Sequence, residues 1–208
     1  MGEGSDRIAF DQRIARVVAR PLARTPLTPN AVTGLSIVVG LGAAWLFAQG
    51  GTSIHWGAGI FVVAVWMDHL DGELARLTDK ASTFGHYFDH VAAMINYVAM
   101  FSGAGIGLSD GALGEWAPVC GVAAGLAVAT IMTVRMWIET RQGKELTQMT
   151  VRFGFEIEDT LYVVGPITWL GLLPPFVVAA GIGAPLFMVF VIREAVRAVR
   201  AAPGTEGS

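Results

Sequence analysis

Three acidic residues with regular spacing are the part of this chain whose side chains could do chemistry. Asp68 and Asp71 are separated by three positions, and Asp89 follows at the start of the next apolar segment. On a helix, Asp68 and Asp71 lie on one face, within an arc of about 100° that also contains Gly72 and Ala75. These two small residues leave room for a ligand to approach the backbone. The spacing predicts a site where facing helix ends bring three carboxylates together.

Oxygen ligands of this kind suit Mg²⁺ or Mn²⁺, and Mg²⁺ typically combines few carboxylates with the phosphates of a substrate. The alternative interpretation is that the acids only solvate the ends of helices. Like-charged carboxylates held together at low dielectric are unfavourable without a cation. The pattern therefore favours a metal site formed by Asp68, Asp71 and Asp89.

The segments that must position these acids have the composition of a membrane protein. Hydrophobic residues make up 53% of the chain, charged residues only 15%, and the mean hydropathy is +0.56. A soluble domain carries about 25% charged residues. The predicted fold is all-α with six transmembrane helices, because most of the apolar segments approach the roughly 20 residues needed to cross the hydrocarbon core. The predicted spans are 31–49, 54–75, 86–107, 116–138, 158–173 and 175–193.

The positions of the basic residues predict the orientation of these spans. All 14 Lys and Arg residues fall within the regions 7–24, 76–80, 135–152 and 193–200. The alternate loops near 50–55, 108–115 and 174–184 carry none. The positive-inside rule then places both termini and the acidic site in the cytoplasm, for an integral protein of the plasma or inner membrane. The single cysteine, Cys120, excludes an internal disulfide and a cysteine metal site within this sequence.

The two ends of the chain differ from its apolar part. Residues 7–22 combine apolar side chains with arginines in a pattern typical of an amphipathic helix in the membrane interface. We expect residues 1–24 to form a cytoplasmic arm and residues 25–200 to form one six-helix membrane domain. Residues 201–208 are expected to be a disordered tail.

The acidic residues belong to a longer pattern. The chain resembles the CDP-alcohol phosphotransferases, whose signature is D-x2-D-G-x2-A-R-x8-G-x3-D-x3-D. The residues 27–33 also resemble the family's segment before its first span, so the resemblance covers about residues 20–200. The signature is matched at every spacing by Asp68, Asp71, Gly72, Ala75, Arg76, Gly85 and Asp89.

The resemblance implies a function and a set of binding residues. Family members transfer a phospho-alcohol or phosphatidyl group from a CDP-linked donor to an acceptor hydroxyl and release CMP, in the synthesis of phospholipids or related polar lipids. The family uses two divalent metal ions, usually Mg²⁺ or Mn²⁺, and Asp68, Asp71 and Asp89 would be metal ligands. The partners implied are the donor, a lipid or polar alcohol acceptor, membrane lipids and a second copy in a homodimer, with no nucleic acid. The nucleotide-binding residues implied are Asn30, Thr33, Asp68, Asp71, Gly72, Ala75, Arg76 and Gly85.

The fourth Asp of the signature is missing, because position 93 is Ala93. In the family that residue is a metal ligand and the favoured general base. With Gly85 at 0° on a helical wheel, Ala93 falls near roughly 80°, His86 near 100° and His90 near 140°. A neutral imidazole can accept a hydroxyl proton near neutral pH, so His90 or His86 is a candidate replacement base. The alternative interpretation is that both are interfacial histidines with satisfied hydrogen bonds.

Two other hypotheses and one further group of residues complete the predictions. The chain could be a family member that binds donor and metal without turnover, whether Ala93 is natural or engineered. A cation transporter with intramembrane carboxylates is disfavoured, because the acids lie at one membrane face. Basic residues on the cytoplasmic side are candidates for holding an acceptor phosphate or lipid headgroup, although they could also serve only to set the topology. These residues are Arg135, Arg141, Lys144 and Arg193.

Overall fold

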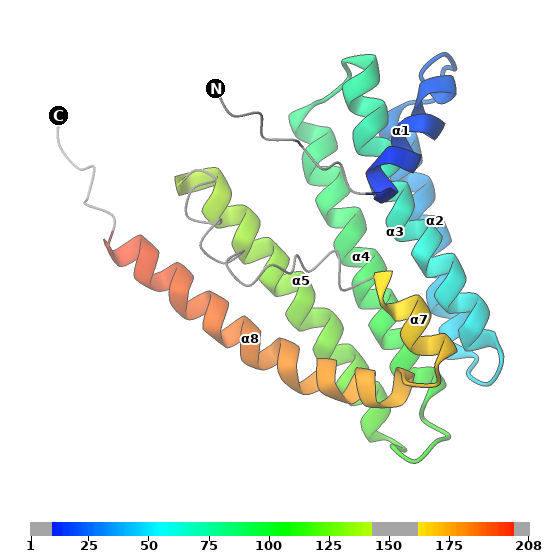
Figure 1. The fold of residues 1–208 in the computed structure, drawn as a ribbon. Coiled ribbons are helices and arrows are strands. Elements are labelled where there is room, and N and C mark those ends of the chain that lie inside the picture. Colours follow the sequence, from blue (N-terminus) through cyan, green and yellow to red (C-terminus); the bar gives the residue numbers. More distant parts are fainter. Residues whose placement is uncertain (1–9, 143–161, 202–208) are drawn as a thin grey trace.

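A computed structural model describes residues 10–142 and 162–201, and in these ranges the chain is helical with no strand (Figure 1). The predicted all-α fold is therefore confirmed. Helices α2 to α5 begin within three residues of the predicted spans. The helices are α1 (Phe10–Leu22), α2 (Pro29–Ala48), α3 (Ser53–Thr78), α4 (Thr83–Gly107), α5 (Trp116–Gln142), α7 (Val164–Trp169) and α8 (Leu173–Ala201).

The start of α2 follows from its local sequence. Thr28 is the N-cap, and its hydroxyl accepts a hydrogen bond from the backbone N–H of Ala31 at 3.2 Å. Pro29 occupies the first helical position, where a missing N–H costs nothing. Residues 27–33, which resemble the family's segment before its first span, thus form the capped start of a helix. This start fixes where Asn30 and Thr33 lie.

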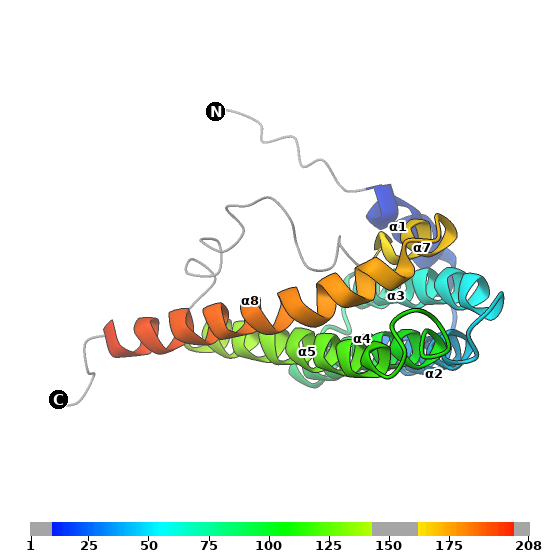
Figure 2. The same cartoon turned by 90° about the horizontal axis from the view of Figure 1, so that it is seen from below.

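Helices α2, α3 and α4 pack together and carry the acidic signature between them. Helix α5 packs on α4, and α8 packs mainly on α5, so these two helices extend away from α1 to α3 (Figure 1). Helices α1 and α7 both pack on α3, on the side that faces away from α2 (Figure 2). The acids are therefore held by the part of the molecule with the most extensive helix contacts.

A single large apolar cluster joins these helices. Phe61 and Tyr97 meet edge to face with ring centroids 6.3 Å apart, and Phe101 stacks on Phe176 at 5.9 Å. The close approach of α2 and α4 depends on glycine, since a Cβ on Gly103 would lie 2.3 Å from the carbonyl oxygen of Ala44. This packing fixes the rotation of α4 about its axis, and therefore which of its residues face the acids of α3.

The six-span count stays a prediction, because three described helices are long and apolar enough to cross a membrane by length and composition. These segments are Pro29–Ala48, Trp116–Ile138 and Leu173–Ala198. Helices α3 and α4 have sufficient length, with 26 and 25 residues. Helix α3 contains the polar signature residues, and neither α3 nor α4 is among the three segments.

The predicted boundary between the fifth and sixth spans is wrong. Helix α7 ends at Trp169 rather than at residue 173, a turn follows, and α8 begins at Leu173 rather than at Pro175. Gly171 adopts a left-handed conformation in this turn, with φ of +74°. Prolines are tolerated in the first turn of a helix, where no intrahelical N–H bond is needed, so the Pro174–Pro175 pair starts α8 instead of separating two helices. The earlier part of the predicted fifth span lies outside the described residues.

Helix α1 is part of the predicted N-terminal arm and packs directly on α3. Its residues Ala15 and Ala19 are fully buried, while Arg16 and Arg20 are exposed. Ala19 joins a second apolar cluster with Met67 of α3 and Val32 of α2. The position of α1 in a membrane interface stays a prediction. The rest of the predicted tail beyond Ala201 and the first nine residues lie outside the described residues.

Candidate donor-binding site

A cavity of about 260 Å³ opens where the N-termini of α2 and α4 meet the C-terminal end of α3. Seven of the eight predicted nucleotide-binding residues line it, and the exception is Asp68. The lining also includes two further residues predicted for metal or proton transfer, Asp89 and His86. The full lining is Pro29, Asn30, Thr33, Asp71, Gly72, Ala75, Arg76, Lys80, Ala81, Ser82, Gly85, His86 and Asp89.

A tight connection between α3 and α4 forms one wall of this cavity. Helix α3 ends at Asp79, which adopts the left-handed conformation with φ of 53°, and the N–H of Lys80 then bonds to the carbonyl of Ala75 at 3.1 Å. Ser82 caps α4, because its hydroxyl accepts a hydrogen bond from the N–H of Gly85 at 3.0 Å. This short turn reverses the direction of the chain between α3 and α4, so the signature residues of α3 face those of α4.

Gly85 has a specific steric role in the cavity. A Cβ at this position would lie 3.1 Å from Oγ of Ser82 and 3.2 Å from Oδ1 of Asn30. These two side chains would have to move by a few tenths of an ångström to admit a Cβ, so the glycine allows the N-termini of α2 and α4 to lie close together.

Asp71 is held by a hydrogen bond from a different helix. The Thr33 hydroxyl on α2 donates to Oδ2 of Asp71 at 2.5 Å, and Asp71 is only 4% exposed. The same hydroxyl lies 3.2 Å from the carbonyl oxygen of Pro29, but its single proton favours the shorter, charge-assisted bond. Thr33 therefore orients a predicted metal ligand, in addition to lining the cavity where the resemblance placed it.

The carboxylate of Asp89 lies close to those of Asp68 and Asp71. Asp89 interacts with the side chains of both Asp68 and Asp71. Oδ1 of Asp89 is buried and has no hydrogen-bond partner among the described residues. Two carboxylates in such contact require a proton or a cation between them. An unpartnered buried oxygen in a cavity lined by a second carboxylate fits a hard divalent cation.

The side chains that the structure describes do not complete a metal site by themselves. Within residues 10–142 and 162–201, no group of three or more His, Cys, Asp or Glu side chains is arranged to hold a metal ion. Magnesium commonly takes one or two carboxylates and completes its coordination with water and substrate phosphates. The arrangement is thus suited to a cation that binds together with a phosphate-containing ligand.

The two candidate histidines occupy different positions. His86 is exposed and lines the cavity, whereas His90 is half-buried and does not. Both interact electrostatically with Asp89, as does His69 of α3. Ala93 lies one turn further along α4, is 8% exposed, and belongs to the apolar cluster that contains Phe61 and Tyr97. The position of the missing carboxylate is therefore surrounded by apolar side chains.

Sequence reasoning missed four polar residues near the site. Lys80 and Ser82 line the cavity, and the Ser82 cap carries a recognisable sequence signal, a serine just before a helical segment. Nδ1 of His69 lies 3.2 Å from the hydroxyl of Tyr162, a contact between residues 93 positions apart. No local pattern in the sequence indicates the contact between His69 and Tyr162.

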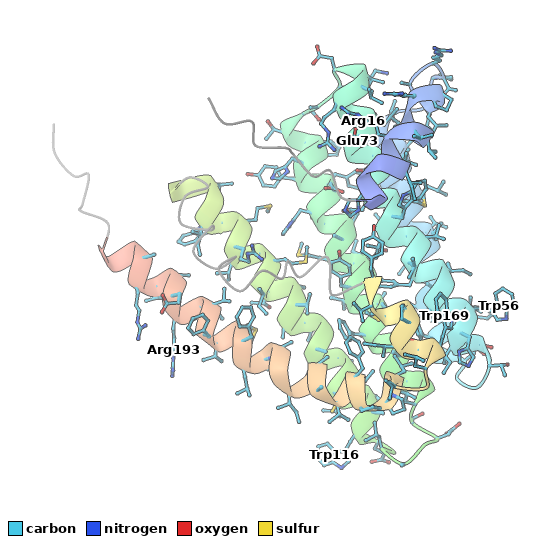
Figure 3. All side chains as sticks on the ribbon, viewed as in Figure 1. Arg16, Trp56, Glu73, Trp116, Trp169 and Arg193 are labelled. Carbon is cyan, nitrogen blue, oxygen red and sulfur yellow. The ribbon has the colours of Figure 1, made fainter. Side chains whose placement is uncertain are left out.

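Two of the four residues predicted to hold an acceptor phosphate can be placed, and both lie away from this cavity. Arg135 is half-buried on α5 and Arg193 is exposed on α8, and neither lines the cavity. Figure 3 shows Arg193 on the far side of the molecule from Glu73 of α3. The side chains of Arg141 and Lys144 lie outside the described residues. Their acceptor role remains a prediction.

The chain is similar in sequence to known proteins. The family model for CDP-alcohol phosphatidyltransferase matches residues 26–192. An archaetidylinositol phosphate synthase from Pyrococcus horikoshii is 31% identical over 91 residues, which are 43% of this chain and 47% of that protein. The matched part thus spans about half the length of this relative.

Two crystal structures share the fold. Both are of phosphatidylinositol phosphate synthase from Mycobacterium tuberculosis. The structure with CDP-DAG bound has a TM-score of 0.69 at 20% identity, covering 94% of this chain and 98% of the other. The apo structure has a TM-score of 0.67 at 21% identity, covering 92% and 99%. At this identity the likeness shows the fold.

Proposed function

Since the chain belongs to the CDP-alcohol phosphatidyltransferase family, we propose that it transfers a phospho-alcohol or phosphatidyl group from a CDP-linked donor to an acceptor hydroxyl and releases CMP. The observation that carries this proposal is the cavity at the ends of α2, α3 and α4. It collects residues that are up to 60 positions apart in the chain, and they include six of the seven matched signature residues, all except Asp68. The product would be a phospholipid or a related polar lipid.

The donor would bind in this cavity through its nucleotide and phosphate groups. Asn30 and the two small residues Gly72 and Ala75 line the part where a nucleotide could contact the backbone. Arg76 and Lys80 supply positive charge for the phosphates. The site lies where two helices begin and one ends, so the N-termini of α2 and α4 add partial positive charge.

Asp71 and Asp89 would hold Mg²⁺ or Mn²⁺, with Asp68 in contact with Asp89. When bound, the metal would neutralise the charge of the donor pyrophosphate and of the leaving CMP. Thr33 keeps Asp71 in place for this role through its hydrogen bond. Ala93 cannot act as a metal ligand, so a second metal ion would need other ligands at this site.

In the proposed transfer, the acceptor oxygen forms a bond to the donor phosphorus, and the bond between that phosphorus and the CMP oxygen breaks. CMP leaves with the electron pair, and the acceptor hydroxyl gives its proton to a base. His90 and His86 are the proposed bases, because both lie close to Asp89. His86 faces the cavity directly. Positioning and electrostatic stabilisation supply most of the catalysis.

The acceptor is proposed to be a polar alcohol that carries a phosphate, such as an inositol phosphate. The names of the relatives, archaetidylinositol phosphate synthase and phosphatidylinositol phosphate synthase, support this class. Arg135, Arg141, Lys144 and Arg193 remain the proposed phosphate contacts on the acceptor side.

The apolar helices and the family indicate an integral membrane protein. We place its site and both termini in the cytoplasm, following the distribution of Lys and Arg. Donor lipid would then reach the cavity from the adjacent leaflet. A homodimer is proposed from the resemblance alone.

A second candidate function is donor binding without turnover. The burial of Ala93 among apolar side chains favours it, because nothing at that position can accept a proton or bind a cation. This candidate predicts that CDP and Mg²⁺ raise the unfolding temperature without any release of CMP from a CDP-linked donor.

The test is a CMP-release assay with Mg²⁺ or Mn²⁺, CDP-diacylglycerol or CDP-archaeol as donor, and inositol phosphate among the acceptors. The proposed transfer predicts metal-dependent CMP release that Asp68→Ala abolishes. Loss of activity in His90→Ala supports His90 as base, whereas unchanged turnover in that variant rules it out. If the chain binds CDP and both it and Ala93→Asp release no CMP, donor binding without turnover is the better description.

A further inference from the structure

Glu73 is a buried acid next to the signature that the proposed chemistry does not use. It is 8% exposed and does not line the donor cavity. Its two carboxylate oxygens contact arginines from different helices. Oε1 accepts a hydrogen bond from Nη2 of Arg76 at 2.8 Å, and Oε2 lies 3.7 Å from Nε of Arg16 on α1. Figure 3 shows Arg16 and Glu73 together where α1 lies against α3.

The burial of Glu73 needs an explanation, because a carboxylate removed from water is unfavourable unless it is paired. The pairing here is unequal. The contact with Arg76 is a hydrogen bond of 2.8 Å, whereas the contact with Arg16 is 3.7 Å long. A contact of 3.7 Å is too long for a hydrogen bond and is the weaker of the two. The stronger interaction therefore links Glu73 to Arg76.

Arg76 is the group that gives this pairing a functional meaning. Its side chain is 66% exposed and also lines the donor cavity. A long, exposed arginine has many rotamers, and binding an anion requires that most of them be lost. A bond to a buried, immobile carboxylate three residues earlier on the same helix restricts the guanidinium before the ligand arrives. The rest of its five N–H donors stay available to a second acceptor.

We propose that Glu73 is a positioning residue that holds the Arg76 guanidinium at the mouth of the cavity, ready to contact the phosphates of a CDP-linked donor. This inference rests on the proposed function, since it assumes that the cavity binds a cytidine nucleotide. Arg16 supplies the second countercharge that makes the buried carboxylate tolerable. Glu73 acts on the donor through Arg76 and does not touch it.

The competing explanation is that Glu73 only anchors α1 to α3 through Arg16. The two explanations differ in which arginine is coupled to Glu73 in donor binding. Residues that act as a unit give non-additive effects, whereas independent residues give multiplicative changes in the dissociation constant. A double-mutant cycle on CDP binding therefore separates them.

The experiment is calorimetric titration of the full chain in detergent micelles with CDP and Mg²⁺. We expect Glu73→Gln to weaken CDP binding about tenfold and Arg76→Gln to weaken it at least as much. The double variant should be no weaker than Arg76→Gln alone. Arg16→Gln should change the dissociation constant by less than about threefold. The pair Glu194 and Arg197 on α8 has the same spacing and a 2.7 Å contact outside the cavity, so Glu194→Gln is the matched control and should have no effect.

Each of the other outcomes has a distinct meaning. Multiplicative effects of Glu73→Gln and Arg76→Gln overturn the inference, as does an Arg16→Gln effect equal to that of Glu73→Gln. If Glu73→Gln does not fold, Glu73→Asp replaces it. This variant keeps the negative charge, but its side chain is one methylene shorter, so the carboxylate no longer reaches Arg76 as closely. Glu73→Asp should weaken CDP binding about threefold, and wild-type binding by this variant overturns the inference. If the wild-type chain binds no CDP, the proposed function itself fails.

Discussion

The hydrogen bond between Thr33 and Asp71 is the contact whose removal tests the site most directly. Thr33→Val replaces a hydroxyl with a methyl group of nearly the same size, so the packing between α2 and α3 is preserved. The bond it removes is short, 2.5 Å, and joins two buried residues, Thr33 at 3% and Asp71 at 4% exposure. Water therefore has little access to replace the lost donor.

The expected size of the effect follows from this burial. Hydrogen bonds to charged groups contribute about 1.5–3 kcal/mol, and 1.4 kcal/mol corresponds to about a factor of ten in an equilibrium constant. Removing a group that orients a metal ligand weakens the metal affinity by about 10- to 100-fold. We therefore expect Thr33→Val to weaken Mn²⁺ binding by about 10- to 100-fold in the presence of CDP.

The measurement is a titration of Mn²⁺ into the purified chain with saturating CDP, following free Mn²⁺ by electron paramagnetic resonance. Thr33→Ser keeps the hydroxyl and should bind Mn²⁺ within about threefold of the wild type. Thr168→Val is the second control. It removes another fully buried threonine hydroxyl, which donates to the carbonyl of Val164 at 2.7 Å and is not part of the cavity.

Two results would refute this reasoning. Mn²⁺ binding by Thr33→Val within twofold of the wild type would mean that the hydroxyl does not orient Asp71 for a metal. An equal loss in Thr33→Ser and Thr33→Val would assign the effect to packing. A weaker affinity for CDP with all metal chelated would instead support direct contact between Thr33 and the nucleotide.

Three further perturbations have defined outcomes. Gly40→Ala would place a Cβ 2.1 Å from Oδ1 of the buried Asn96. We therefore expect this variant to lose about 1–3 kcal/mol of unfolding free energy, measured by chemical denaturation. Gly42→Ala is the control, because a Cβ there has no atom within 4 Å, and it should lose less than about 0.5 kcal/mol. Lys80→Met should weaken CDP binding about fivefold at low salt and less at high salt, and a salt-independent loss would argue against a charge effect. Ser82→Ala removes the cap of α4 and should lower the unfolding free energy by about 1 kcal/mol, and no change in thermal unfolding would mean that the cap bond does not persist in solution.

Much of the fold was predictable because its signals are local. Apolar content and segment length predicted helices that α2 and α5 reproduce, and the spacing of Asp68 and Asp71 placed them on one helix face. The family was also predictable and is confirmed, because the signature is a linear pattern with fixed spacing. The break after α7 was predicted at Pro174 and Pro175 but lies before them, since two adjacent prolines can start a helix as well as end one.

The composition of the site was predicted better than its interactions. Asn30, Gly72 and Arg76 line the cavity as expected. Asp68 does not line it, although its contact with Asp89 keeps it beside the predicted metal ligands. A helical wheel gives the direction of a side chain within one helix, but it cannot give the rotation of that helix against its neighbours.

The sequence by itself determined the helical class, the membrane-like composition and the identity of the acidic signature, because each depends on residues close together in the chain. Only the tertiary structure decided that Thr33 bonds to Asp71 across 38 positions, that Ala93 lies in the apolar cluster, and that Glu73 is buried beside Arg16 of another helix. These contacts depend on how close-packed helices rotate and cross, which many distant side chains fix together. The chemistry of the site was therefore encoded locally, while its geometry is a property of the whole bundle.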